Sequence, residues 1–254
     1  MFYDVFDPSL PRLGPGDEAA TRRALDVVLS HAPDMRQRPL RILDVGCGNG
    51  AQTLPLARAT RGRIVAIDNH EPYVDELRRR AHAAGLAERI DARVGDMHAL
   101  AELDAASFDV IWSEGALYIM GLAPALKACR PLLTPGGMLA FSDIAWLTPD
   151  SPEACKAFFA ADCPDMTDVA GTVRMIHDAG YEVLEHFVLP EAAWSRNYYA
   201  PLAARLATLR AAGWGDDERR AGLLATVEAE IALWREHGGH YGYVFYVLRP
   251  GGEG

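Results

Sequence analysis

The stretch LDVGCGNG places three glycines in a turn directly after an apolar run. Such a turn is where we first expect a ligand to bind. Glycines crowded in a turn let the backbone approach a ligand closely. Counted as Gly46, Gly48 and Ala51, they satisfy the dinucleotide-binding pattern G-x-G-x-x-G/A. Counted after Asp44 as Gly46, Gly48 and Gly50, they satisfy a second pattern, D-x-G-x-G-x-G. The spacing alone does not name the ligand.

Acidic residues near the same turn narrow the choice of ligand. Asp44 lies two residues before Gly46, where it would face a pyrophosphate but would suit a cationic amino acid group. Asp68 follows Gly46 by 22 residues and is placed to accept hydrogen bonds from two ribose hydroxyls. The stretch GDMHAL offers Asp96 to an exocyclic amine and Met97 to an adenine face. Asp44 favours a ligand with a cationic amino acid group, whereas Asp68 does not discriminate, because both classes of cofactor contain a ribose.

Short apolar runs alternate with helical patterns from residue 41 to about 144, which predicts βαβ units and a parallel sheet. Pro72 and Gly85 mark the two ends of one such helix. Asp17 is a plausible N-cap of another. The expected strands are 41–46, 63–68, 90–96, 108–114, 136–144, 181–190 and 241–249. A Pro-Gly-Gly turn is expected before the fifth strand, and an irregular stretch through Pro149, Pro152 and Pro164 is expected after it.

The chain is expected to form a single domain that spans residues 1–254. Two segments that flank the alternating pattern are expected to cover its ligand site. Residues 1–35 are predicted to form an N-terminal helical lid, which includes the stretch RLGPGD. Residues 191–240 are too long for a plain connection and show helical spacing, so they predict a helical cap before the last strand. The same segment is equally compatible with pairing to a second subunit, so a homodimer stays open.

Five motifs in order, LDVGCGNG, AIDNH, GDMHAL, FDVIWSEGALY and LLTPGGMLAFSD, resemble those of the class I S-adenosylmethionine-dependent methyltransferases. The flanking stretches LPRLGPGDEAATRRAL and HYGYVFYV further resemble a bacterial small-molecule methyltransferase subgroup. The resemblance implies an α/β fold with a Rossmann-like, seven-stranded, mostly parallel sheet and helices on both faces. Its last strand is expected to run antiparallel between the fifth and sixth.

The resemblance also implies S-adenosylmethionine as the cofactor. Gly46, Gly48 and Gly50 would then let the backbone approach the methionine part, and Asp44 would lie near its amino group. Asp68 would hold the ribose. Asp96 and Met97 would hold the adenine, and the neighbouring Cys47, Asn69 and Ser113 are expected at the same site.

Methyl transfer is an in-line displacement, so the protein mainly supplies alignment and a deprotonated nucleophile. Glu114 ends the fourth expected strand and is the candidate catalytic base, with a backbone or capping role as the alternative. Substitution Glu114→Gln is expected to keep cofactor affinity and lose most turnover. The candidate substrate-binding residues are Tyr3, Arg12, Tyr118, Trp146, Trp194 and Tyr198.

The composition of the chain argues against several classes of binding partner. A formal net charge of −10 argues against a nucleic-acid footprint, and the departure of WSEGALY from N/D-P-P-Y/F argues against a nucleobase amine as acceptor. No apolar run approaches the length that spans a membrane. Four cysteines without a C-x-x-C pair predict a reduced, cytoplasmic protein. His237 and His240 lack the spacing of a helical ligand pair, so no metal is expected.

The sequence leaves three possible functions open. The favoured one is transfer of a methyl group from S-adenosylmethionine to a small-molecule acceptor, without a choice among carbon, nitrogen, oxygen and sulfur. A catalytically silent sensor of S-adenosylmethionine or S-adenosylhomocysteine has the same fold. A nicotinamide-dependent oxidoreductase corresponds to the other spacing of the glycines.

Overall fold

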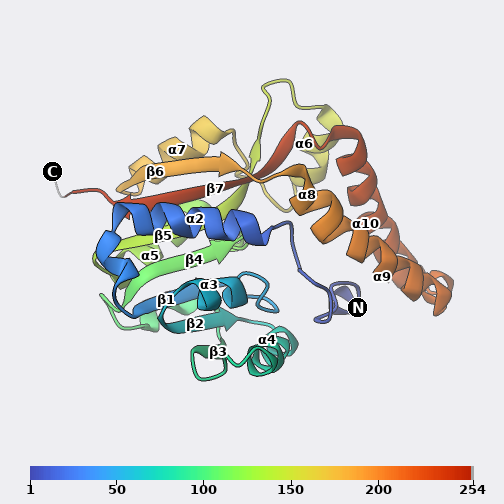
Figure 1. The fold of residues 1–254 in the computed structure, drawn as a ribbon. Helices are drawn as coiled ribbons and strands as arrows, with labels where there is room; N and C mark the ends of the chain where they lie inside the picture. Colours follow the sequence, from blue (N-terminus) through green and yellow to red (C-terminus); the bar gives the residue numbers. More distant parts are fainter. Residues whose placement is uncertain (253–254) are drawn as a thin grey trace.

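A computed structural model describes residues 1–252 and contains one seven-stranded sheet (Figure 1). The strand order is β3-β2-β1-β4-β5-β7-β6, and β7 is antiparallel to both of its neighbours, which confirms the predicted topology. The strands are β1 (Leu40–Val45), β2 (Gly62–Asp68), β3 (Ile90–Val94), β4 (Phe108–Glu114), β5 (Leu133–Trp146), β6 (Tyr181–Val188) and β7 (Tyr241–Pro250).

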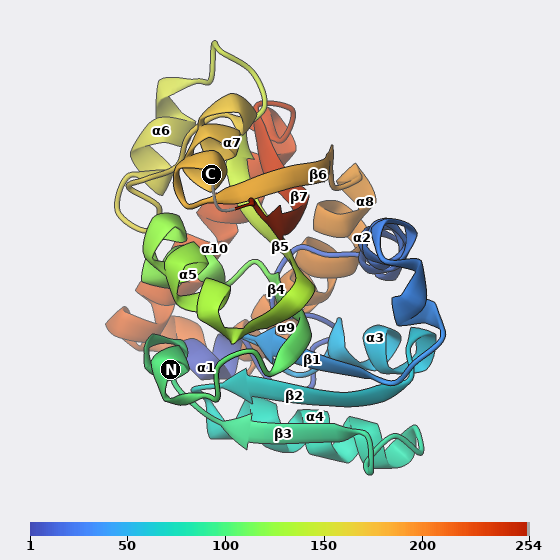
Figure 2. The same cartoon turned by 90° about the vertical axis from the view of Figure 1, so that its left-hand side faces the viewer.

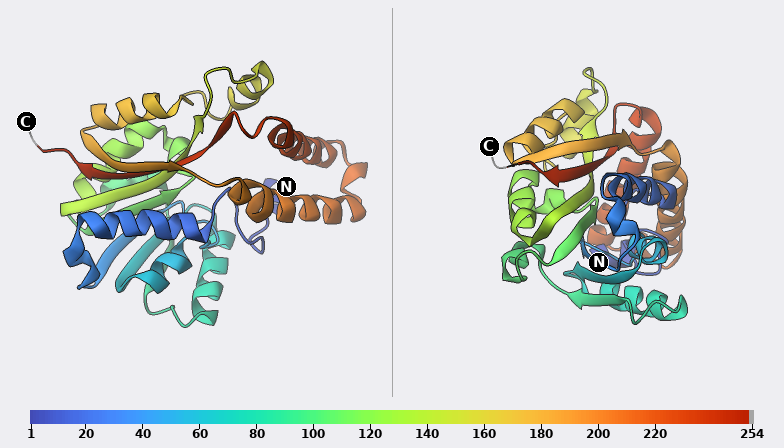
Figure 3. Two further views of the ribbon diagram at one scale, coloured as in Figure 1. Left: turned by 45° about the horizontal axis from the view of Figure 1, so that its top comes forward. Right: turned by 60° about the vertical axis from the view of Figure 1, so that its left-hand side comes forward.

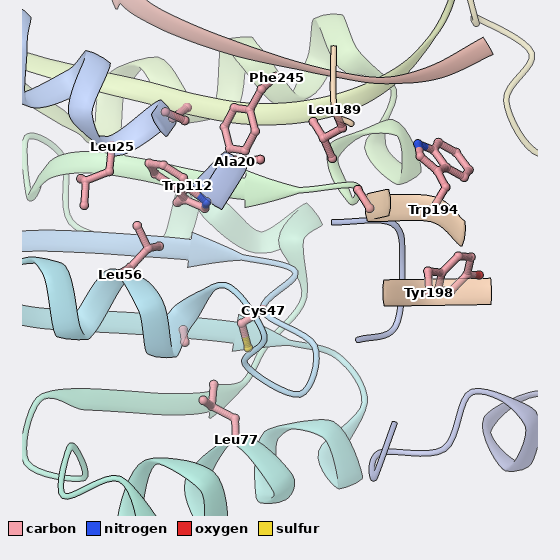
Figure 4. Close-up of a cluster of buried hydrophobic side chains, with 14 of the residues drawn as sticks. Ala20, Leu25, Cys47, Leu56, Leu77, Trp112, Leu189, Trp194, Tyr198 and Phe245 are labelled. Atoms are coloured by element: carbon pink, nitrogen blue, oxygen red, sulfur yellow. The ribbon is translucent and has the colours of Figure 1, made fainter. Parts of the chain in front are cut away.

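Helices cover both faces of the sheet (Figure 2). One face carries α2 (Glu18–His31), α3 (Thr53–Ala59) and α4 (Glu71–Ala83), and the other carries α5 (Leu122–Cys129) and α7 (Val169–Asp178). Sheet residues on both faces are therefore buried, which explains why the central strands are almost continuously apolar. Figure 4 shows Trp112 and Phe245 under α2 in the larger of two apolar clusters.

The two helix starts that the sequence marks are confirmed. Asp17 caps α2, because its side chain accepts a hydrogen bond of 3.0 Å from the backbone N–H of Ala20. Pro72 lies in the first turn of α4, where its missing N–H is not needed. The helix α2 leads the chain from the N-terminal segment onto the sheet, so this cap also fixes where that segment joins the domain.

A helical group lies between β6 and β7: α8 (Glu191–Trp194), a π-helical turn η5 (Ser195–Tyr199), α9 (Ala200–Ala211) and α10 (Glu218–His237). Its two long helices project beyond the carboxyl ends of the parallel strands (Figure 1), and the N-terminal residues lie against them (Figure 3). Arg205 of α9 donates to the carbonyl of Asp4 at 2.7 Å. The short helix α1 (Phe2–Val5) thereby sits at the same edge of the sheet.

The sequence analysis was wrong about two local features. The stretch after β5 was expected to be irregular because of its prolines, yet it contains α6 (Glu153–Phe159), which starts directly after Pro152. The Pro-Gly-Gly stretch was expected to be a turn before β5, but it lies within the strand, at a register shift opposite β4. Among residues 1–252, no helix combines the length and the apolar character needed to cross a membrane.

Candidate functional site

The glycine turn follows β1 and packs closely against the chain after β4. Gly46, Gly48 and Gly50 have φ values of +70°, +51° and +86°, which lie in the left-handed region that favours glycine. A Cβ at Gly46 would lie only 2.4 Å from the Cβ of Ala116. The turn therefore presents backbone, not side chains, to the neighbouring cavity.

This cofactor cavity, as we call it, measures about 190 Å³ and lies at the carboxyl ends of β1, β2 and β4. Its walls include six of the ten predicted cofactor residues, Gly46, Cys47, Gly48, Asp68, Asn69 and Met97, together with Arg12 and Glu114. Gly50 is not part of the wall and instead approaches Leu77 of α4. The volume is small for a ligand site, because Arg12 to Pro15 form one side of it.

Asp68 ends β2 and holds the glycine turn in place. One carboxylate oxygen accepts the N–H of Gly48 at 2.9 Å, and the other accepts the N–H of His70 at 2.9 Å. Burial raises the pKa of this carboxyl, and the two backbone donors oppose that shift. Each oxygen retains a second lone pair for another donor, so Asp68 can accept two ligand hydroxyls while it stays bonded to the turn.

Besides Gly50, three predicted cofactor residues do not line the cavity. Asp44 is fully buried behind it, where it accepts from Thr53 at 2.6 Å and from Gln52 at 3.2 Å, so direct contact with a ligand is not open in this conformation. Ser113 is also fully buried and donates to the carbonyl of Val45 at 2.8 Å. Ser113 therefore connects β4 to β1 through this hydrogen bond and does not line the cavity as predicted.

Asp96 is the third of these residues. It is exposed, and it accepts the N–H of His98 at 2.9 Å as the cap of the 3-10 helix η2 (Met97–Glu102). The next residue, Met97, does line the cavity, and a Cβ at Gly46 would lie 3.6 Å from its methyl carbon. Asp96 thus places Met97 at the wall by capping the turn that carries it.

Glu114 ends β4 and has partners for both carboxylate oxygens. One oxygen accepts from Thr21 at 2.6 Å and from the indole N–H of Trp112 at 3.1 Å, and the other accepts from Arg12 at 3.2 Å. The side chains of Arg12 and Glu114 are only 11% and 5% exposed, so the pair is buried. The catalytic role predicted for Glu114 stays a prediction, and the geometry shows a holding role for the N-terminal segment.

Residues 1–16, the N-terminal segment, are fastened to the glycine turn and α4 by side chains that the sequence analysis missed. The amide of Asn49 donates to the carbonyl of Leu10 at 2.6 Å, and Arg80 donates to the same carbonyl at 2.8 Å. The hydroxyl of Tyr73 donates to the carbonyl of Phe6 at 2.7 Å. Because each acceptor is a backbone carbonyl, no residue pattern in the segment could have revealed these bonds.

Substitution Arg12→Ala is expected to release the N-terminal segment. Breaking one side of a buried ion pair costs about 3 kcal/mol, which corresponds to about a 100-fold larger open population. Chymotrypsin should then cleave within residues 1–16 about 100-fold faster, provided that the cleavage rate is proportional to the population of the open state. The control is Arg22→Ala, which breaks an exposed pair with Glu18 and should leave the rate unchanged. Equal rates in the two variants would contradict the holding role of Arg12.

The aromatic residues predicted for substrate binding separate into two groups. Trp194 stacks on Trp234 with ring centroids 4.5 Å apart and is buried (Figure 4), so it belongs to the core of the helical group. Trp146 packs edge-on against Phe159, and it lines none of the described cavities near the glycine turn. Both side chains pack against other aromatic rings, and their roles in substrate binding stay predictions.

The remaining aromatic residues keep their predicted place near the carboxyl edge. Tyr3 stacks on His70, next to Asp68, with ring centroids 3.4 Å apart. Tyr198 is buried within the same apolar cluster as Trp194 (Figure 4). Tyr118 lines a second, larger cavity. The substrate roles of these three residues stay predictions.

The second cavity measures about 710 Å³ and adjoins the first, since Ile119 of η3 (Leu117–Met120) lines both. Asp143 of β5 lines it and is 7% exposed, although the sequence analysis did not single this residue out. A carboxylate inside the apolar run LAFSDIAW, at the carboxyl end of a central strand, is the signal that could have found it.

Comparisons with known proteins relate the chain to methyltransferases. Residues 42–137 match a family described as a methyltransferase domain (Methyltransf_25). The chain is 26% identical over 184 residues to a sterol 24-C-methyltransferase of Gibberella zeae, a match that covers 68% of the chain but only 48% of that relative. It is 28% identical over 202 residues to the uncharacterized protein YjhP of Escherichia coli, with 78% of each chain covered.

A solved structure shows the same fold over nearly the whole chain. It is a S-adenosylmethionine-dependent methyltransferase from Thiobacillus denitrificans in complex with S-adenosyl-L-homocysteine. The TM-score is 0.81 at 21% identity, and the match covers 98% of this chain and 97% of that one. The fold of the chain is that of this S-adenosylmethionine-dependent methyltransferase, and residues 42–137 match a methyltransferase domain.

The residues around the cofactor cavity fit S-adenosylmethionine better than a dinucleotide. Within residues 1–252, Arg12 is the only Lys or Arg that lines the cavity, and it is already paired with Glu114. Asp68 and Glu114 leave the cavity with an excess of negative charge, which suits a sulfonium and an ammonium group. The same charge would repel a pyrophosphate.

Proposed function

We propose that the protein binds S-adenosylmethionine at the glycine turn and transfers its methyl group to a small-molecule acceptor. The observation that carries this proposal is Asp68, which braces the turn through the N–H of Gly48 and still offers lone pairs to the cavity. A ribose with two free hydroxyls matches these lone pairs. The excess negative charge of the cavity matches the positively charged remainder of the cofactor.

In this proposal different residues of the cavity wall contact different parts of the cofactor. Gly46 and Gly48 border the methionine part, Asp68 and Asn69 the ribose, and Met97 the adenine. Asp44 acts from behind the wall, by its charge and through Gln52, which lines the cavity and donates to it. Asp96 acts by positioning Met97.

When bound, S-adenosylmethionine supplies an electrophilic methyl carbon. The chain contributes alignment and exclusion of water. The N-terminal segment, held by Arg12 and Asn49, covers the cavity and keeps water away from the reacting atoms. Its bonds must open for the cofactor to enter, since Leu13 lies against Gly48.

The experiment incubates the protein with methyl-labelled S-adenosylmethionine and a deproteinised extract of bacterial metabolites. We expect label in the small-molecule fraction with the native chain and not with Asp68→Ala. Tight cofactor binding without any transfer would instead favour the sensor reading. We further propose a cytoplasmic location, supported by four cysteines that occur without a C-x-x-C pair.

A further inference from the structure

The second cavity has an acidic lining. Its carboxylates are those of Asp143, Asp162 and Asp165, and within the described residues 1–252 no Lys, Arg or His lines it. Its volume of about 710 Å³ is that of a site for a small organic molecule. An anionic ligand would meet three carboxylates without a counter-ion, so the cavity selects against such a ligand.

Asp143 is the buried member of this set. Its side chain accepts one hydrogen bond, of 2.8 Å, from the N–H of the adjacent Ile144, and no cation partners it in the described part of the chain. A buried carboxylate without a partner is costly to keep. A ligand that brings a positive charge and N–H donors would remove that cost.

The groups whose pKa values are raised by the charge of Asp143 come from three other parts of the chain and stay neutral near pH 7. They are Tyr118 of η3, Tyr243 and Tyr246 of β7, and Cys163 of the segment between α6 and α7. Burial raises the pKa of Tyr118 to about 12 and that of the Cys163 thiol to about 11.

Asp143 differs from these neighbours. Burial raises its pKa to about 7, and the N–H of Ile144 opposes the shift. At neutral pH this carboxyl can therefore both hold and release a proton.

The acidic cavity adjoins the cofactor cavity near the end of β4. Tyr243 lies over Gly115, because a Cβ at that glycine would be 2.6 Å from the tyrosine ring. Gly115 lines the cofactor cavity, and Ile119 lines both cavities. A ligand held at Asp143 would thus lie next to the end of β4 and beside the cofactor cavity.

We propose that the acidic cavity is the acceptor site and that it takes an amine, which enters as an ammonium ion on Asp143. This inference rests on the proposed methyl transfer and specifies its substrate class. The ammonium gives one proton to the Asp143 carboxylate, and its nitrogen lone pair then forms the bond to the methyl carbon. The carbon–sulfur bond breaks with its electron pair left on sulfur. The product is a methylated ammonium, and the proton on Asp143 passes to water.

The test uses a matched panel of acceptors with methyl-labelled S-adenosylmethionine. Each carbon skeleton, from ethyl to naphthylethyl, is offered as the primary amine, the alcohol and the carboxylic acid. We expect label in amines only. Substitution Asp143→Asn should lower kcat/KM for the best amine by about 100-fold, through both kcat and KM, and leave cofactor affinity unchanged.

The control for the change in net charge is Asp104→Asn, an exposed carboxylate remote from both cavities, which should keep native turnover. At saturating cofactor, kcat/KM of the native chain for the amine should fall as the pH drops below about 7, because the carboxylate of the free site becomes protonated. Asp143→Asn should lack this fall. A merely structural role for Asp143 would not produce that difference.

Each other outcome overturns the inference in a distinguishable way. Label in alcohols or acids, or no label in any amine while calorimetry shows cofactor binding, rejects the amine site and leaves the proposed methyl transfer standing. An Asp143→Asn variant with native amine turnover also rejects it. Absence of S-adenosylmethionine binding defeats the proposed function, and the acceptor site with it.

Discussion

Substitution Asp68→Ala is expected to weaken S-adenosylmethionine binding by on the order of 100-fold or more. A hydrogen bond to a charged group contributes about 1.5–3 kcal/mol, and two ribose hydroxyls lose such a bond in this variant. The glycine turn also loses the acceptor for the N–H of Gly48, so the backbone that borders the methionine part becomes less well ordered. Both effects lower the affinity for S-adenosylmethionine.

Equilibrium binding of S-adenosylmethionine, measured by calorimetry, checks this prediction. Asp68→Asn keeps one acceptor oxygen and should lose less affinity than Asp68→Ala. Asp104→Ala removes the same charge from an exposed position that does not line the cofactor cavity, and it should bind like the native chain. A loss below threefold in Asp68→Ala would show that the ribose is not held at the end of β2.

Cofactor affinity is expected to fall as the pH is lowered, because of Asp44. Burial raises the pKa of this carboxyl to about 7, the negative charges of Glu114 and Asp68 add to the shift, and the hydrogen bonds from Thr53 and Gln52 oppose it. The ammonium group of the cofactor favours the ionised form of Asp44. Binding should therefore require loss of a proton below about pH 7.

The sign and size of this dependence can be measured directly. From pH 8 to pH 5 the affinity should drop by about 100-fold, since a group with a pKa near 7 is about 1% ionised at pH 5. Calorimetry in buffers of different ionisation enthalpy should show proton release on binding near pH 6.5. Asp44→Asn should bind weakly and lose this release, whereas Asp143→Asn should retain it. An affinity that is independent of pH in the native chain would reject a charge role for Asp44.

The sheet could be predicted because its strands carry their own signals. The runs at 63–68 and 108–114 are apolar, end at an acidic residue and alternate with helical patterns, and both strands end where expected. The helix α6 was missed because Pro149, Pro152 and Pro164 suggested an irregular stretch. In the structure Pro152 instead occupies the N-cap position of that helix.

The cofactor cavity was predicted better than the acidic cavity, for a physical reason. The turn at Gly46 and the carboxylate of Asp68 are local features, since each follows a strand directly in the sequence. Contacts between distant segments are not local: the bond from Asn49 to the carbonyl of Leu10 spans 39 residues and leaves no residue pattern. Trp194 was assigned to a pocket because its partner in the stack, Trp234, lies in another helix.

The central claim is that the glycine turn after β1 holds S-adenosylmethionine. Isothermal calorimetry of the native chain with S-adenosylmethionine, S-adenosylhomocysteine and NADH tests it most directly, with Asp68→Ala measured alongside. We expect the first two ligands to bind, Asp68→Ala to weaken both, and NADH not to bind. Binding of NADH without binding of S-adenosylmethionine would contradict the account, because the glycines would then serve a dinucleotide.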